Sequence, residues 1–123
     1  MHISNTPQKL RIAIAGLGFG KKIHLEALKE SDYLIPTAIY HYKKEKGPLL
    51  EKETGLNFYH DWDFLVKCKD IDGIIIATSP ESRFELAKEA LKNNKHLLLE
   101  KPVALTSHEI EELQRLSLIN NLS

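Results

Sequence analysis

Short apolar segments alternate with helix-like segments along this chain, and the alternation constrains its fold more than any other feature. Strands are expected over residues 10–15, 34–40, 56–59, 71–78 and 96–100. The segments between them are short and carry helical patterns, which is typical of β-α-β units and of a parallel sheet. We therefore predict an α/β fold with a five-stranded, doubly wound, mainly parallel sheet.

Local signals mark where several helices begin and end. Gly47 and Pro48 are expected to open a short helix that Gly55 ends. Asp61 or Asp63 can cap the next helix. Three longer helices follow the first, fourth and fifth strands. Their expected inward-facing residues are Ile23, Ala27 and Leu28, then Phe84, Ala87 and Leu91, and finally Ile110, Leu113 and Leu116.

A glycine-rich turn follows the first strand, with Gly16, Gly18 and Gly20 at alternate positions. A tight turn and the close approach of a pyrophosphate both require residues without side chains, and a helix amino terminus offers free N–H groups to an anion. Lys21 and Lys22 oppose the dipole of the helix that follows, which makes sense if an anion binds nearby. The usual pattern has its third glycine one residue later, at position 21. We predict a Rossmann-like dinucleotide site here; the alternative is a purely structural turn.

The end of the second strand bears on which dinucleotide would bind. The acidic residue that usually contacts the ribose hydroxyls, about 20 residues after the glycines, is missing. His41, Lys43 and Lys44 stand there instead. Because no carboxylate would repel a 2′-phosphate, we favour NADP over NAD as the cofactor. The alternative is that these lysines belong to a solvated loop.

Lys101 directly follows the fifth strand, and Pro102 restricts the backbone beside it. The carboxyl end of a parallel strand is where open α/β sheets place ligands and chemistry. A lysine that acts as a base would need a pKa lowered by burial or by a nearby positive charge. We predict an active-site role for Lys101; the alternative is a solvated charge.

Composition narrows the class of protein. The 123 residues are expected to form one domain, with residues 1–9 as a flexible N-terminus. Basic and acidic residues number 17 each, so no nucleic-acid or membrane partner is expected. The start lacks a signal-peptide pattern, and the single Cys68 is expected to be a small buried residue, so we predict a cytoplasmic protein. Helix capping accounts for Asp61 and Asp63, and no metal site is predicted.

Three segments, Ala15 to His24, Asp72 to Pro80 and Asn94 to Pro102, together resemble the N-terminal domain of the glucose–fructose oxidoreductase/inositol dehydrogenase (Gfo/Idh/MocA) family. The likeness extends from Leu10 to about Asn121. Two positions differ from the family pattern, which often has proline where Ser79 stands and histidine where Arg83 stands.

The resemblance implies a set of site residues. The glycine loop would hold the cofactor pyrophosphate, Thr78, Ser79 and Pro80 would flank the nicotinamide, and Glu100 would lie near the nicotinamide ribose. Lys101 would handle a proton or orient the substrate. The cofactor-binding residues expected from the sequence and the resemblance are Gly16, Leu17, Gly18, Phe19, Gly20, Lys21, His41, Lys43, Thr78, Ser79, Pro80, Glu100 and Lys101.

The resemblance also implies what this chain lacks. Members of the family continue with a sixth strand and a C-terminal antiparallel-sheet domain that carries the substrate pocket. We therefore expect the nucleotide-binding domain of an NAD(P)-dependent oxidoreductase for a sugar, polyol or related hydroxy compound, without useful turnover in this chain alone. The alternatives are a non-catalytic, dinucleotide-responsive or partner-binding module and a domain for another adenine-containing ligand. Without a sixth strand, residues 96–100 would form an open edge, which predicts self-association.

Overall fold

The computed structural model describes residues 9–16, 19–78, 80–99 and 107–119. Strands and helices alternate along the described chain, as the sequence predicts. In chain order they are β1 (Leu10–Ala15), α1 (Phe19–Glu30), β2 (Leu34–Tyr40), the 3-10 turn η1 (Lys44–Lys46), α2 (Gly47–Thr54), β3 (Asn57–Tyr59), α3 (Trp62–Val66), β4 (Gly73–Ile76), α4 (Pro80–Lys92), β5 (His96–Leu99) and α5 (Ser107–Ile119).

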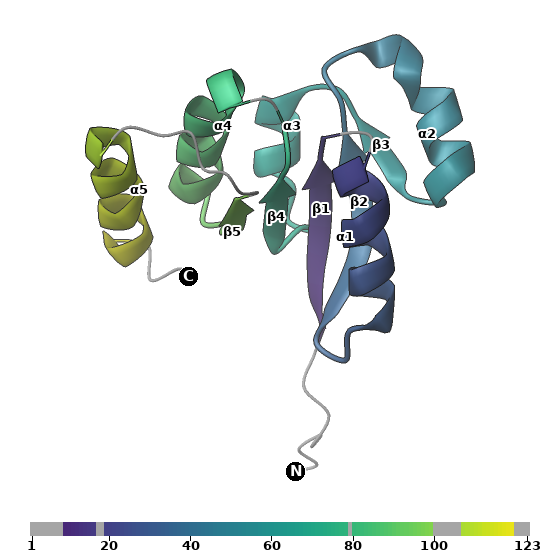
Figure 1. The fold of residues 1–123 in the computed structure, drawn as a ribbon, viewed down its shortest axis with the longest axis horizontal. Coiled ribbons are helices and arrows are strands. Elements are labelled where there is room, and N and C mark those ends of the chain that lie inside the picture. The colour runs from purple at the N-terminus through teal and green to yellow at the C-terminus, as the bar shows by residue number, and fades with distance from the viewer. Residues whose placement is uncertain (1–8, 17–18, 79, 100–106, 120–123) are drawn as a thin grey trace.

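The strands form one parallel sheet in the order β3-β2-β1-β4-β5. The order reverses between β1 and β4, because the chain first winds outward to β3 and then returns to the other side of β1. Figure 1 shows the sheet with β1 near its centre and α5 at the far end, beyond β5. The prediction of a five-stranded, doubly wound, Rossmann-like sheet is confirmed.

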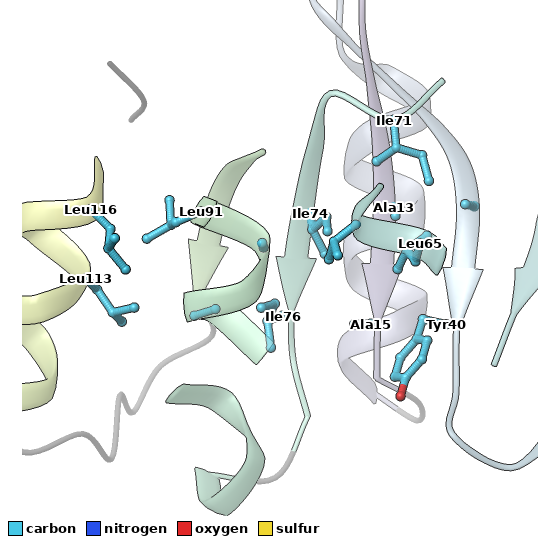
Figure 2. Packing of buried hydrophobic residues seen from close by; sticks show 14 residues of the cluster. Ala13, Ala15, Tyr40, Leu65, Ile71, Ile74, Ile76, Leu91, Leu113 and Leu116 are labelled. Atoms are coloured by element: carbon cyan, nitrogen blue, oxygen red, sulfur yellow. The ribbon is translucent and has the colours of Figure 1, made fainter. Parts of the chain in front are cut away.

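Alternate residues of the strands build a core on each face of the sheet. On one face, Ile12, Ile14 and Ile75 pack with Leu25 and Leu28 of α1. On the other face, smaller strand residues such as Ala13 and Ala15 lie beneath α3 and α4. Helix α5 packs outside α4, and Figure 2 shows Leu113 and Leu116 directed toward Leu91.

The predictions that Ala27 and Ile110 face the core are wrong. Ala27 is exposed, because the larger Leu25 and Leu28 occupy the sheet-facing side of α1. Ile110 is 38% exposed, because α5 contacts α4 through Leu113 and Leu116. The inner stripe of α4 is as predicted, with Ala87 and Leu91 buried and Phe84 packed against the same core; the side chain of Ile23 lies outside the described residues.

Strand and helix ends differ from the predictions by one or two residues. The regular part of β4 is Gly73–Ile76, although Asp72 and Ala77 still make strand-like backbone bonds to β1. Asp61, not Asp63, caps α3 by accepting the Phe64 amide, and Gly55 ends α2 with φ of 72°. Pro36 lies near the start of β2, where a missing amide does least harm. Strand β3 pairs only with residues 38–40, so the proline falls outside the segment that is paired on both sides.

Polar contacts hold the amino-terminal end of the sheet. Asp72 Oδ2 accepts the backbone N–H of Arg11 at 2.7 Å and its Nε at 3.1 Å. The hydrogen bond from Arg11 lowers the pKa of Asp72 below its usual value. Lys95 is 7% exposed, and its ammonium donates to the carbonyls of Cys68 and Ile71. Cys68 itself is partly exposed rather than fully buried, with its thiol 3.9 Å from the Tyr59 hydroxyl.

No helix in the described part of the chain is long and apolar enough to cross a membrane.

Candidate functional site

A cleft of about 460 Å³ opens at the carboxyl ends of the strands where the strand order reverses. This is the place where open parallel sheets bind their ligands. Strand ends and one face of α4 supply its walls. The lining residues are Gly16, Tyr40, His41, Tyr42, Ala77, Thr78, Ser82 and Leu86. None of these lining residues, which belong to the described part of the chain, is acidic.

Gly16 lies at the floor of this cleft, where β1 leaves the sheet. Its φ is 126°, and a Cβ placed on it would come within 2.6 Å of the Ala77 carbonyl oxygen. No residue with a side chain fits there, because the ends of β1 and β4 approach each other too closely. The glycine is therefore required by the turn itself, and the same bare backbone is open to a ligand in the cleft.

The remainder of the glycine turn leads directly into α1. Leu17 and Gly18 lie outside the described residues, whereas Phe19, Gly20 and Lys21 form the first turn of the helix. That turn contains no acidic residue. The helix thus begins three residues after Gly16, in the arrangement that the phosphate-binding prediction requires.

The end of β2 forms a stacked aromatic and basic wall. The ring of His41 stacks on Tyr42 with centroids 4.8 Å apart, and Lys43 Nζ lies 5.7 Å from the centre of the Tyr42 ring. His41 Nδ1 accepts the Lys43 amide at 3.0 Å. Burial, followed by the charges of Lys46 and Lys43, lowers the pKa of His41. The lowered pKa favours the neutral form of His41, so the positive charge of this wall comes mainly from its lysines.

A hydrogen-bonded turn between β4 and α4 forms the opposite wall. Ser82 Oγ and Thr78 Oγ1 are 3.0 Å apart, and Arg83 Nε donates to the Thr78 carbonyl at 2.8 Å. Arg83 is only 6% exposed, so a cation is buried directly behind the cleft. Pro80 is the first residue of α4, and Ser79 lies outside the described residues.

Several cleft residues were missed from the sequence. Ser82 and Leu86 are four residues apart on α4, so they share the face that lines the cleft. Tyr40 ends β2 and Tyr42 lies two residues further on, close to the switch point. The helix face shared by Ser82 and Leu86, and the strand end near the two tyrosines, were the sequence signals that could have identified them. Arg83 could have been noticed as the position where the resembled family often has histidine.

The two residues expected to act beside the nicotinamide, Glu100 and Lys101, lie outside the described residues. Strand β5 ends at Leu99 and pairs with β4, whose end contributes Ala77 and Thr78 to the cleft. Strand β5 therefore ends at the same edge of the sheet as the cleft. Among the described residues, no group of three or more His, Cys, Asp or Glu side chains is arranged to hold a metal ion.

A doubly wound parallel sheet with a glycine at the switch point, a helix beginning just after it and a cleft over that glycine defines the class of dinucleotide-binding domains. Residues 10–118 match the family described as an oxidoreductase family with an NAD-binding Rossmann fold, Gfo/Idh/MocA. The chain belongs to this family and represents its NAD(P)-binding domain, which confirms the resemblance drawn from the sequence.

Similar proteins point the same way. An uncharacterized oxidoreductase of Synechocystis, sll0816, is 34% identical over 88% of this chain and 29% of its own length. A myo-inositol 2-dehydrogenase of Thermotoga maritima is 28% identical over 85% of this chain and 31% of its own length. The solved structure of scyllo-inositol dehydrogenase from Lactobacillus casei with bound NAD(H) and scyllo-inositol superposes with a TM-score of 0.81 at 27% identity, over 94% of this chain and 35% of that chain. This chain therefore spans about a third of the length of such relatives.

Proposed function

We propose that this chain supplies the cofactor half of an NAD(P)-dependent oxidoreductase that acts on a sugar, a polyol or a related hydroxy compound. The observation that carries the proposal is the cleft over Gly16, at the point where the strand order reverses. The inositol dehydrogenases among its relatives support the substrate class. The relatives' greater length supports a substrate-binding part outside this chain.

The residues at the cleft suit the two ends of a dinucleotide. Its pyrophosphate would lie over the Gly16 backbone and the first turn of α1, with Lys21 nearby in the sequence. The adenosine part would lie against the wall formed by His41 and Tyr42. Thr78, with Ser79 and Pro80, would border the nicotinamide side. When bound, the cofactor supplies a hydride acceptor or donor.

Lys101 is proposed as the residue that takes the proton from the substrate hydroxyl during oxidation, or returns it during reduction. Lys101 follows the end of β5 by two residues in the sequence, and Glu100 would border the nicotinamide ribose. Because the substrate-binding part is not within these residues, the chain alone is expected to bind cofactor without useful turnover. A second copy of this chain, associated through residues 96–100, is proposed as a further partner.

NADP is favoured over NAD for a physical reason. The wall at the end of β2 carries Lys43, and lysines 44 and 46 follow it with Glu45 between them, so this segment has more positive than negative charges. A 2′-phosphate adds negative charge that these ammonium groups can bind, whereas an NAD ribose would gain nothing from them. Because Nδ1 of His41 accepts the Lys43 amide, the neutral ring carries its proton on Nε2 and can donate a hydrogen bond from there.

Titration of the chain with NADPH and with NADH, followed by calorimetry, tests both parts of the proposal. Both cofactors are expected to bind, with NADPH the tighter. Lys43→Gln should weaken NADPH binding about three- to tenfold, the value of roughly one exposed charge pair, and change NADH binding less than about twofold. Lys29→Gln, in the last turn of α1, is the matched control and should leave both unchanged.

The outcomes separate the function from the cofactor preference. If neither cofactor binds at millimolar concentration, the oxidoreductase proposal fails. If NADH binds as tightly as NADPH, or if Lys43→Gln weakens both equally, only the preference for NADP fails. Lys101→Ala, assayed in a protein that carries the substrate-binding part, should abolish turnover; unchanged turnover would favour a cofactor-responsive, non-catalytic module.

A further inference from the structure

Trp62 contacts both walls of the cleft without lining it. Its ring meets the ring of Tyr40 edge to face, with centroids 4.8 Å apart and planes at 70°. Its indole Nε1 donates to the backbone carbonyl of Leu86 at 3.2 Å. Tyr40 ends β2, Leu86 lies on α4, and both residues line the cleft. One side chain from α3 therefore joins the two elements that bound the cleft.

The local structure fixes where this indole lies. Tyr59, at the end of β3, pairs with Tyr40, and its carbonyl accepts the His41 amide at 3.1 Å. Asp61 then caps α3, so Trp62 is the first residue of that helix. The partly buried ring also packs against the core beneath α3 and α4. Because a strand end, a helix cap and the core all hold it, Trp62 keeps Tyr40 and Leu86 at a set separation.

This separation matters for the adenosine half of a dinucleotide. In the proposed function the adenosine lies against His41 and Tyr42, and Ser82 and Leu86 stand across the same cleft. Stacking on aromatic side chains is a main source of affinity for a base. A base between two walls gains from both only when both touch it, since a gap of about 0.5–1 Å forfeits roughly a quarter to a half of the contact energy. A residue that sets the distance between the walls therefore sets the affinity for the base.

We infer that Trp62 is a positioning residue for the adenosine half of the cofactor, acting through Tyr40 and Leu86. The inference rests on the proposed function. It is independent of the substrate-binding part, because Trp62 and both walls belong to the described residues of this chain. The ring contact with Tyr40 and the N–H bond to Leu86 are separate interactions, so substitutions can remove them one at a time.

Two variants of the full chain test the inference in steps. Trp62→Phe keeps an aromatic ring beside Tyr40 and loses the hydrogen bond to Leu86, whereas Trp62→Leu loses both. Calorimetry measures the binding of NADPH and of adenosine 2′,5′-bisphosphate, which is the adenosine half of NADP. The dissociation constants should rise about two- to threefold in Trp62→Phe and about three- to tenfold in Trp62→Leu. The factor should be the same for both ligands, because the whole loss lies in the half that they share.

Tyr59→Phe is the matched control. It removes one polar group from the same core, the hydroxyl that lies 3.9 Å from the Cys68 thiol, and Tyr59 does not line the cleft. The control should change the affinity for either ligand less than about twofold. Circular dichroism and urea unfolding show that each variant is folded and separate a loss of stability from a loss of affinity.

Fluorescence gives a readout that a purely structural role would not move. Trp62 is the single tryptophan of the chain, so indole emission reports on this position alone. Adenosine 2′,5′-bisphosphate does not absorb the emitted light. Its binding should nevertheless change the emission, with the midpoint found by calorimetry, because Tyr40 and Leu86 close on the ligand and both contact the indole.

Equal and graded weakening for the two ligands supports the inference. Unchanged affinity in a folded Trp62→Leu overturns it, as does weakening for NADPH alone or binding of the bisphosphate without a change in emission. If Trp62→Leu does not fold, Trp62→Phe decides by the same criteria. A wild type that binds NADPH but not the bisphosphate at millimolar concentration also overturns the inference. A wild type that binds neither ligand contradicts the proposed function instead.

Discussion

Two glycines with positive φ illustrate different constraints on single residues. At Gly16 the backbone has a φ of 126°, and a side chain would also collide with the Ala77 carbonyl. At Gly55 the φ is 72°, and no atom lies within 4 Å of the place that a Cβ would take. The first glycine is fixed by conformation and by contact, and the second by conformation alone. The difference can be measured, because both replacements add one methyl group.

Gly16→Ala should destabilise the chain by about 3 kcal/mol or more and widen the floor of the cleft. Gly55→Ala should cost only about 1–2 kcal/mol, the usual penalty for a left-handed backbone with a side chain. Urea unfolding followed by circular dichroism measures both values. Equal destabilisation by the two substitutions would show that the Ala77 contact relaxes freely.

At the scale of elements, the contact between Arg11 and Asp72 joins β1 to the residue just before β4. Asp72 receives three hydrogen bonds from the backbone and side chain of Arg11, whereas Asp70 receives one at 3.4 Å. The Asp70 side chain is 88% exposed and that of Asp72 is 28% exposed. Two neighbouring carboxylates therefore bind the same guanidinium in very different surroundings, and only Asp72 is expected to matter for stability.

The stability contributed by Asp72 should depend on pH. Its pKa is lower in the folded chain than in the unfolded chain, so its contribution is complete above the unfolded value, about 3.9, and is lost as the pH falls through the folded value. Asp72→Asn should cost about 1–2 kcal/mol at pH 6 and progressively less below about pH 4. Asp70→Asn, the control, should cost under about 0.5 kcal/mol at either pH. Urea unfolding at several pH values measures this, and a gap that widens in acid would contradict the assignment.

The architecture could be predicted because strands, helices and turns each carry a local signal. Pro36, Gly55 and Asp61 all do in the structure what their chemistry indicates. Choices between neighbouring residues could not be predicted in the same way. Spacing pointed to Ala27, but packing against the sheet selects Leu25, because the larger side chain gains more from burial.

The candidate site was predictable where a motif carries it and not where the fold alone creates it. Gly16 and Thr78 lie in segments with a recognisable pattern. Tyr42, Ser82 and Arg83 reach the site only because β2, β4 and α4 converge on the switch point. Their contribution depends on the strand order, which no local pattern encodes.

At the scale of the whole molecule, the sheet separates two cores of different composition. Isoleucines of β1 meet α1 on one face, and alanines of the same strand allow α3 and α4 to come close on the other. Both cores share the central strands, so neither can open widely without the other. The outer strand β5 and helix α5 depend on fewer neighbours, since α5 packs on α4. Unfolding should therefore begin at that end of the molecule.

Chemical labelling of Lys95 can test whether unfolding begins at the end of the molecule that holds β5 and α5. Its ammonium is held against the carbonyls of Cys68 and Ile71, and the side chain is 7% exposed, so an acylating reagent cannot reach it in the closed state. Exposed lysines such as Lys52 should be acetylated within minutes, whereas Lys95 should react only as fast as the β4–β5 end opens. Mass spectrometry of a labelling time course would measure that opening directly. Equal labelling rates for Lys95 and Lys52 would mean that the β4–β5 end is open most of the time. The buried Lys95 thus reports how often this end of the molecule opens to solvent.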